Sequence, residues 1–291
     1  MLGTTTVNLA HSPDADDLVM WWPLTGQGHP DTGSFALPQV ETRGIGFTLT
    51  ARDVEELNKL AVSGGAPYDV TAVSAAAYPA IADRYAITRA GASFGEGYGP
   101  KLVVRRGSAI HSLADLGGDL IAVPGLNTTA CMVLRLALPG AHLVEMLFSD
   151  IPGAVAAGDV DAGLLIHEAQ LTFARDGLHA IEDMGRWWGA HTGGMPLPLG
   201  LNVVRRDLSD LDAVCEMLAA SVQIAARERE ASKGFLRRNN AGKPEWADDA
   251  LLDRYLDMYV SPMTVDMGEP GRAALAELYA RAAAAGLIDA A

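Results

Sequence analysis

His167 is the residue whose type and position best suit acid–base chemistry in this sequence. It follows the apolar run 162–166, which is typical of a buried strand. An imidazole titrates near neutral pH, so a neutral histidine at a strand end can accept a proton from a bound molecule. A structural role is the commoner one for such a histidine, and the residues alone leave that alternative open. If the strand continued, Glu168 would point to the opposite face, which disfavours a His–Glu dyad.

Hydroxyl side chains stand at two predicted helix starts. Thr128 and Thr129 open a helix after the predicted strand 120–123, and Ser74 precedes a predicted helix at 75–84. The N–H groups in the first turn of a helix, together with nearby hydroxyls, can bind a carboxylate. Plain N-capping is the commoner use of these residue types, and it is the alternative at both places.

The loop after the first predicted strand carries Ser12 and three acids, Asp14, Asp16 and Asp17. Three acids suggest a metal only weakly, and capping of the following helix is the preferred interpretation. The role of this loop stays open. The sequence also contains no zinc motif, phosphate-binding loop, Rossmann glycine fingerprint or nucleophile elbow. We therefore expect neither a metal nor a cofactor.

Composition and charge exclude several classes of protein. The 291 residues are 49% hydrophobic and 20% charged, as in folded globular proteins, and the net charge of −14 disfavours binding to nucleic acid. No stretch approaches the roughly 18 apolar residues of a membrane span, and the start of the chain does not resemble a signal peptide. We therefore expect a cytoplasmic protein with a small-molecule partner. No obligate protein partner is indicated.

Short apolar strands alternate with amphipathic helices, which predicts an α/β protein with mainly parallel sheets. The strand 7–10 and its loop resemble the strand 120–123 and its loop. The segment 61–74 likewise resembles 155–167, since each has a helix end, a glycine, an aspartate, an apolar strand and a polar residue. Two similar lobes would explain both correspondences, and chance similarity of short α/β units is the alternative.

The pattern restarts after the glycine-rich segment 91–99, so we expect an inserted second lobe at 102–204. The first lobe would then comprise 1–101 and 205–291. In parallel α/β sheets, ligands bind beyond the carboxyl ends of the strands. The polar segments that follow the four corresponding strands, near 11–17, 74, 124–129 and 167, should therefore converge in a cleft between the two lobes.

Several linked motifs carry a family resemblance along nearly the whole chain. They are Ser12-Pro13 with Asp17, Val73-Ser74 with Ala76–Tyr78, Gly97–Pro100, Ala122–Gly125 with Thr128–Ala130, Ile166–Glu168, Pro196–Gly200, Tyr259-Val260, and Asp266 with Gly268-Glu269. In this order they resemble the 1,4-dihydroxy-6-naphthoate synthase family of the futalosine route to menaquinone. The resemblance implies a two-lobed fold like a type II periplasmic-binding protein, without export. It also implies a lyase that acts on cyclic dehypoxanthine futalosine and needs no known cofactor.

Carried over by position, the family's catalytic base falls on His167. Its substrate-contacting serine falls on Ser74 and its threonine on Thr129. The neighbouring candidates for substrate binding are Ser12, Ala72, Val73, Thr128 and Ala130. Two departures put the fine substrate contacts in doubt: the chain has Asp16 where the family often has Asn, and Ala169 where it often has Gly or Ser.

Two other functions stay open on the sequence. A non-catalytic binding protein for a small carboxylated ligand would use the same fold, because a fold does not fix a function. The related chorismate dehydratase of the same pathway is the second, and the Ile-His-Glu motif weighs against it.

Overall fold

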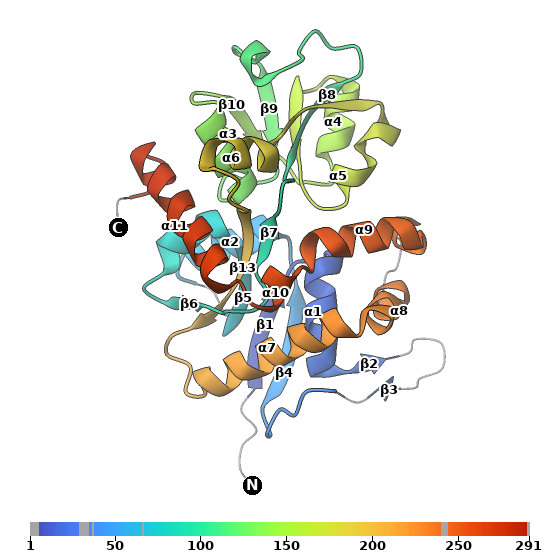
Figure 1. Ribbon diagram of the computed structural model, residues 1–291, viewed down its shortest axis with the longest axis vertical. Coiled ribbons are helices and arrows are strands. Elements are labelled where there is room, and N and C mark those ends of the chain that lie inside the picture. The colour runs from blue at the N-terminus through green and yellow to red at the C-terminus, as the bar shows by residue number, and fades with distance from the viewer. Residues whose placement is uncertain (1–5, 29–34, 37, 66, 240–243, 290–291) are drawn as a thin grey trace. The chain divides into compact units, whose positions relative to one another are not determined.

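The computed structural model describes residues 6–28, 35–36, 38–65, 67–239 and 244–289 (Figure 1). The chain divides into two compact units. The first unit comprises 1–73, 80–93 and 200–268, and the second comprises 74–79, 94–199 and 269–291. In this division the short segment 74–79 and the C-terminal segment belong to the second unit, whereas the sequence analysis assigned both to the first lobe. The lobe boundaries, with 102–204 inserted between 1–101 and 205–291, remain a prediction.

The first unit is built on a sheet with the strand order β4-β1-β5-β13-β6, and β7 pairs with β13. β1 runs parallel to both β4 and β5, whereas β13 and β6 pair antiparallel. The strands are β1 (Thr6–His11), β4 (Gly46–Ala51), β5 (Val70–Ser74), β6 (Tyr85–Ile87), β7 (Ser93–Gly95) and β13 (Leu197–Arg205). The short strands β2 (Gln27–Gly28) and β3 (Phe35–Ala36) form a separate antiparallel pair.

The alternation of side chains along β1 anchors the core of the first unit. Val7 and Leu9 are fully buried, while Asn8 between them is exposed, as the two-residue period of a strand requires. Helix α1 packs against α7, and the Ser221 hydroxyl of α7 donates to the Met20 carbonyl of α1 (Figure 1). The helices of this unit are α1 (Ala15–Thr25), α2 (Val54–Val62), α7 (Leu211–Arg227), α8 (Arg229–Asn239), α9 (Asp249–Tyr259), α10 (Pro262–Val265) and the 3-10 helix η4 (Pro244–Ala247).

The second unit is built on a five-stranded sheet with the order β10-β9-β11-β8-β12. β9 runs parallel to both β10 and β11, and β8 is antiparallel to both β11 and β12. The strands are β8 (Lys101–Arg105), β9 (Leu120–Val123), β10 (His142–Glu145), β11 (Ala162–Leu165) and β12 (Leu178–Asp183). Helix α4 lies so close to β11 that a Cβ atom at Gly163 would come within 2.5 Å of the Ile151 side chain.

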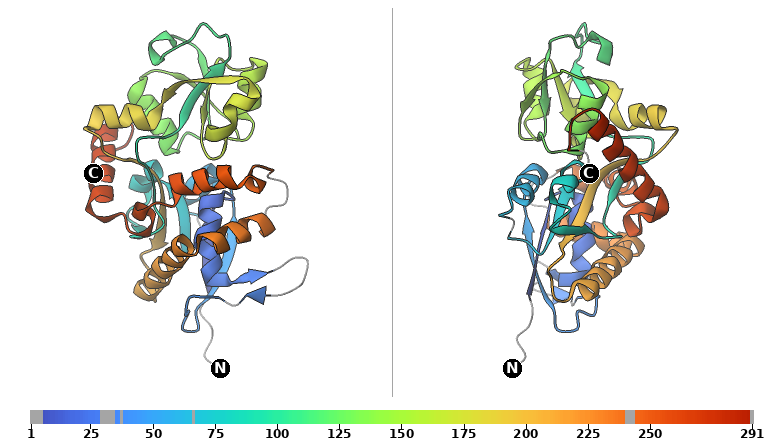
Figure 2. Two further views of the ribbon diagram at one scale, coloured as in Figure 1. Left: turned by 45° about the vertical axis from the view of Figure 1, so that its right-hand side comes forward. Right: turned by 90° about the vertical axis from the view of Figure 1, so that its left-hand side faces the viewer.

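The second unit also contains most of the short helices. They are the 3-10 helices η1 (Ala75–Ile81, of which residues 80–81 belong to the first unit), η2 (Leu113–Asp115) and η3 (Phe173–Asp176), and the α-helices α3 (Thr129–Ala137), α4 (Ile151–Ala157), α5 (Ala169–Thr172), α6 (Met184–Thr192) and α11 (Gly268–Ala284). Arg281 of α11 donates to the His191 carbonyl of α6 and lies 5.7 Å from the Trp188 ring centre, so α11 packs beside α6 (Figure 2).

The predicted α/β architecture is confirmed, and both sheets prove to be mixed. The helix expected at 75–84 is wrong in type and length, because the structure has the 3-10 helix η1 ending at Ile81. Pro79 lies within it and has no backbone N–H, so it cannot donate the bond that would continue a regular α-helix. The segment β12–α6 was not predicted.

None of the helices in the described ranges is long and apolar enough to cross a membrane. The cytoplasmic location stays a prediction.

Candidate functional site

His167 lies two residues beyond the end of β11, in the turn that leads into α5. The strand ends at Leu165, so the expectation that His167 directly closes the strand is wrong. Its φ angle is +54°, and Arg43 is the one other non-glycine residue with a positive φ within the described part of the chain. This region costs a residue with a Cβ atom about 1–2 kcal/mol. Such outliers persist where the surrounding fold fixes them, and they cluster at functional sites.

The imidazole of His167 packs against an aromatic ring that sequence reasoning missed. The ring centres of His167 and Phe148 are 4.9 Å apart at an angle of 69°, an edge-to-face contact, and the His167 Nε2 atom is buried. Phe148 follows β10, which lies parallel to β9, as β11 does. The carboxyl ends of these three strands therefore meet at one edge of the sheet. This shared edge is the signal that could have identified Phe148.

Thr128 and Thr129 lie at the same edge, because α3 follows β9. Thr128 is the N-cap of α3, and its hydroxyl accepts the Cys131 N–H at 3.2 Å and donates to the Gly125 carbonyl at 2.7 Å. The alternative of plain N-capping is therefore confirmed for the Thr128 hydroxyl. The peptide N–H groups of Thr129 and Ala130 belong to the first turn and have no acceptor within the helix.

The Thr129 hydroxyl has a different set of partners. It accepts the Ala76 N–H at 3.1 Å and donates to the Leu199 carbonyl at 2.8 Å. A hydroxyl has a single proton, and here that proton is donated to Leu199. An anionic ligand at this helix start would therefore be bound by the backbone N–H groups. The predicted role of Thr129 in substrate binding stays a prediction.

The residues predicted along β5 lie where that strand ends. Ala72, Val73 and Ser74 are all buried, with Ser74 the last residue of β5. Ala72 and Val73 belong to the first unit, and Ser74 begins the short segment of the second unit that contacts Thr129 through Ala76. The structure thus brings Ser74 and the α3 start into one unit.

Ser12 belongs to the first unit, in a buried polar loop after β1. Its hydroxyl donates to Asp14 at 2.9 Å, and its N–H donates to Asp17 at 2.8 Å. Asp16 accepts a hydrogen bond from the Tyr255 hydroxyl of α9 at 2.8 Å. The predicted capping of α1 by this loop is only partly seen, because Asp14 occupies the N-cap position without a side-chain cap bond.

Burial raises the pKa of Asp17, and the nearby His11 opposes that rise. Within the described residues, no group of three or more His, Cys, Asp or Glu side chains is placed to hold a metal ion. The expectation of no metal and no cofactor stays a prediction.

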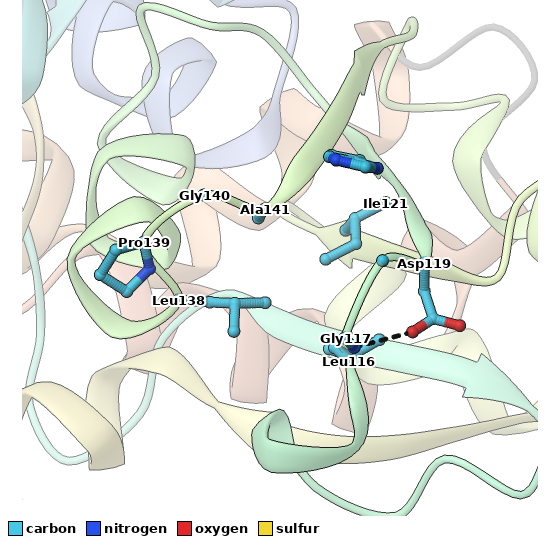
Figure 3. A pocket seen from close by; sticks show the side chains of 10 residues that line it. Leu116, Gly117, Asp119, Ile121, Leu138, Pro139, Gly140 and Ala141 are labelled. Carbon is cyan, nitrogen blue, oxygen red and sulfur yellow. Dashed lines mark hydrogen bonds between the residues drawn. The ribbon is translucent and has the colours of Figure 1, made fainter.

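A cavity of about 220 Å³ lies in the second unit (Figure 3). Its walls come from the residues that precede β9 and β10, and the Asp119 carboxylate accepts the Gly117 N–H at 3.0 Å there. His167 and the start of α3 follow the carboxyl ends of the same parallel strands. This cavity is therefore separate from the candidate site.

Sequence comparison identifies the family of the chain. Residues 7–284 match the family described as menaquinone biosynthesis. The chain belongs to this family. It is 35% identical to a 1,4-dihydroxy-6-naphthoate synthase of Streptomyces coelicolor, over 99% of the chain and 97% of that protein. It is 40% identical to the synthase of the same name from Thermus thermophilus, over 81% of the chain and 83% of that protein.

Structural comparison places this menaquinone biosynthesis protein in the predicted fold. A crystal structure of a protein from Archaeoglobus fulgidus has a TM-score of 0.83 at 38% identity, covering 97% of this chain and 98% of that one. The alkanesulfonate-binding protein of Xanthomonas axonopodis has a TM-score of 0.62 at 17% identity, covering 89% of this chain and 86% of that one. The latter supports the fold alone. The predicted periplasmic-binding-protein-like architecture is confirmed.

Proposed function

We propose that this protein is a 1,4-dihydroxy-6-naphthoate synthase, a carbon–carbon lyase that converts cyclic dehypoxanthine futalosine to the naphthoate. The observation that carries the proposal is similarity to two synthases of that name over most of the length of all three chains. A shared function is expected when likeness of this degree runs through the whole fold.

His167 is the general base in this proposal. A proton taken up at its ring would start the carbon–carbon cleavage that releases the naphthoate. Three features of the structure support this role: the left-handed backbone, the buried Nε2 atom and the edge contact with Phe148.

The carboxylate of the substrate would be bound at the start of α3. The N–H groups of Thr129 and Ala130 and the positive end of the helix dipole suit an anion. The protein carries a net charge of −14, so its long-range field opposes an anionic substrate, and short-range donors must provide the attraction. Ser74, which lies in the same unit as α3, would provide a further contact, and the roles of Ser12, Ala72 and Val73 stay predictions.

A non-catalytic binding protein is the main rival, since the fold is shared with solute-binding proteins. Incubation of the purified protein with cyclic dehypoxanthine futalosine, followed by mass spectrometry, separates the two functions. We expect the naphthoate to appear in proportion to enzyme and time. Tight binding without turnover would establish the binding protein instead. A parallel incubation with chorismate tests the dehydratase, and consumption of chorismate alone would overturn the proposal.

A further inference from the structure

The peptide group that joins Ala75 to Ala76 is held at both of its polar atoms. Its carbonyl accepts a hydrogen bond from the Tyr279 hydroxyl at 3.0 Å, and its N–H donates to the Thr129 hydroxyl at 3.1 Å. The two side chains come from α11 and α3, and all four residues belong to the second unit. A peptide bound at both ends cannot rotate about its neighbouring backbone bonds without losing one partner.

This peptide is part of a longer chain of hydrogen bonds. The Thr129 hydroxyl donates its own proton to the Leu199 carbonyl at 2.8 Å. The sequence of donors therefore runs from Tyr279 through the 75–76 peptide and Thr129 to Leu199. Hydrogen bonds in such a chain polarise one another, so each is strengthened by the rest.

Tyr279 is suited to this role by its surroundings. Its ring stacks on Tyr78 with centres 6.5 Å apart, which fixes the direction of the hydroxyl. Burial raises the pKa of Tyr279 far above its ordinary value, and Tyr78 adds to the rise. The hydroxyl therefore keeps its proton and remains a donor at every pH at which the protein is used.

We infer that Tyr279 is a positioning residue, which fixes the 75–76 peptide and through it the orientation of Ser74 for substrate binding. The inference rests on the proposed function, because Ser74 is a binding residue only there. The C-terminal helix α11 then contributes to substrate affinity through one hydroxyl, without itself contacting the substrate. The same chain of hydrogen bonds gives the Thr129 hydroxyl a role in holding the 75–76 peptide in place.

The test compares Tyr279→Phe with a matched control, Tyr85→Phe. The Tyr85 hydroxyl also donates to a backbone carbonyl, that of Tyr68, at the same distance of 3.0 Å. Tyr68 lies just before the start of β5, whereas Ser74 is at its end, so the control removes a like bond at the other end of the same strand. Both variants keep the aromatic ring.

We expect Tyr279→Phe to raise the KM and the dissociation constant of the naphthoate about 3- to 10-fold, the range that corresponds to one lost neutral hydrogen bond. The kcat should stay within about 2-fold, because His167 is untouched. Hydrogen exchange in a peptide covering 74–79 should become faster. Tyr85→Phe should lower the melting temperature without changing either constant.

An unchanged KM and product affinity in folded Tyr279→Phe would overturn the inference and leave the proposed function standing. An equal rise in both variants would also overturn it, because it would show a general loss of stability. If the wild-type protein forms no naphthoate, the proposed function fails first and the inference fails with it. As a second arm, Thr129→Ser should retain affinity and Thr129→Val should lose it. Loss in both would place Thr129 in direct contact with the substrate.

Discussion

The two units arrange their parallel strands in the same order but carry different side chains where those strands end. In each, an aspartate just before a strand exchanges two hydrogen bonds with the neighbouring parallel strand. Asp69 accepts the Asn8 N–H at 2.9 Å and its own N–H donates to Asn8 at 2.9 Å. Asp161 accepts the Leu120 N–H at 2.8 Å and donates to Leu120 at 3.0 Å.

This register aligns the two sheets residue by residue. β1, β4 and β5 take the places of β9, β10 and β11, so the predicted correspondence of the strands is confirmed, whereas its pairing of the polar residues Ser74 and His167 is one residue out of register. His11 then corresponds to Val123, since each carbonyl accepts the N–H of the residue just after the neighbouring strand, Arg52 and Met146 respectively. Counted from the aspartates, His167 corresponds to Ala75, the residue after Ser74.

The difference lies in the segments that join a strand to the following helix. The end of β1, its loop and the first turn of α1 bury His11, Asp14, Asp16 and Asp17, while the counterpart 123–131 contains no charged residue and no histidine. At the end of β11 the order is reversed, because His167 stands where the chain after β5 has Ala75. A common frame thus carries different chemistry in the segments that follow its strands, as expected when a rigid scaffold carries variable connections.

The largest effect should come from the histidine that follows β11, since the corresponding residue after β5 is an alanine. We predict that His167→Asn reduces turnover by about 100-fold or more, the usual contribution of a positioned general base. Asn tolerates a positive φ better than most residues, so the melting temperature should change little. Steady-state kinetics beside a thermal melt checks both. Near wild-type turnover in the folded variant would remove His167 from the mechanism.

His167→Gly is the companion variant. Glycine adopts the left-handed region freely, although it loses more entropy on folding. We expect equal or slightly higher stability with the same loss of turnover. A clear loss of stability would mean that the ring packing of His167 on Phe148 outweighs its backbone strain.

A smaller effect should separate the two shared aspartates. Asp69 is mostly buried and also lies 3.5 Å from the Arg205 guanidinium, while Asp161 is exposed. We predict that Asp69→Ala costs about 1–3 kcal/mol of unfolding free energy. Asp161→Ala should cost under about 1 kcal/mol, because water replaces its bonds. Urea denaturation measures the unfolding free energy of both variants. Equal costs would show that the hydrogen bond between each aspartate and the neighbouring strand determines the stability, independent of burial.

Much of this frame could be predicted from the sequence. The strand Leu120–Val123 was predicted with its observed bounds, because an apolar run between clear start and stop residues specifies it locally. The left-handed turn at His167 and the partners of Thr129 could not be predicted. Both depend on contacts between segments that are distant in sequence, such as Ala76 with Thr129 and Phe148 with His167.

The smallest expected effect concerns Asp17 in the acidic loop of the first unit. Burial raises its pKa, so the folded protein binds this proton more tightly than the unfolded chain does. The stabilising contribution of the proton is fully present below the unfolded pKa and is lost as pH rises through the folded pKa. Above the folded pKa the ionised, buried Asp17 therefore costs stability relative to its protonated form, although it still accepts the Ser12 N–H.

Asp17→Asn keeps an oxygen for the Ser12 N–H and removes the buried charge. We predict a slightly higher melting temperature than the wild type above the folded pKa of Asp17, with the difference shrinking as the pH falls through that pKa. Melts from acid to neutral pH measure this, with Asp14→Asn as the control from the same loop. A difference that does not vary with pH would show that the cost of Asp17 is steric. A lower melting temperature of Asp17→Asn at neutral pH would show that the attraction between Asp17 and His11 outweighs the cost of burying the Asp17 charge. The two units would then differ by a stabilising charge pair in the first unit rather than by a destabilising buried charge.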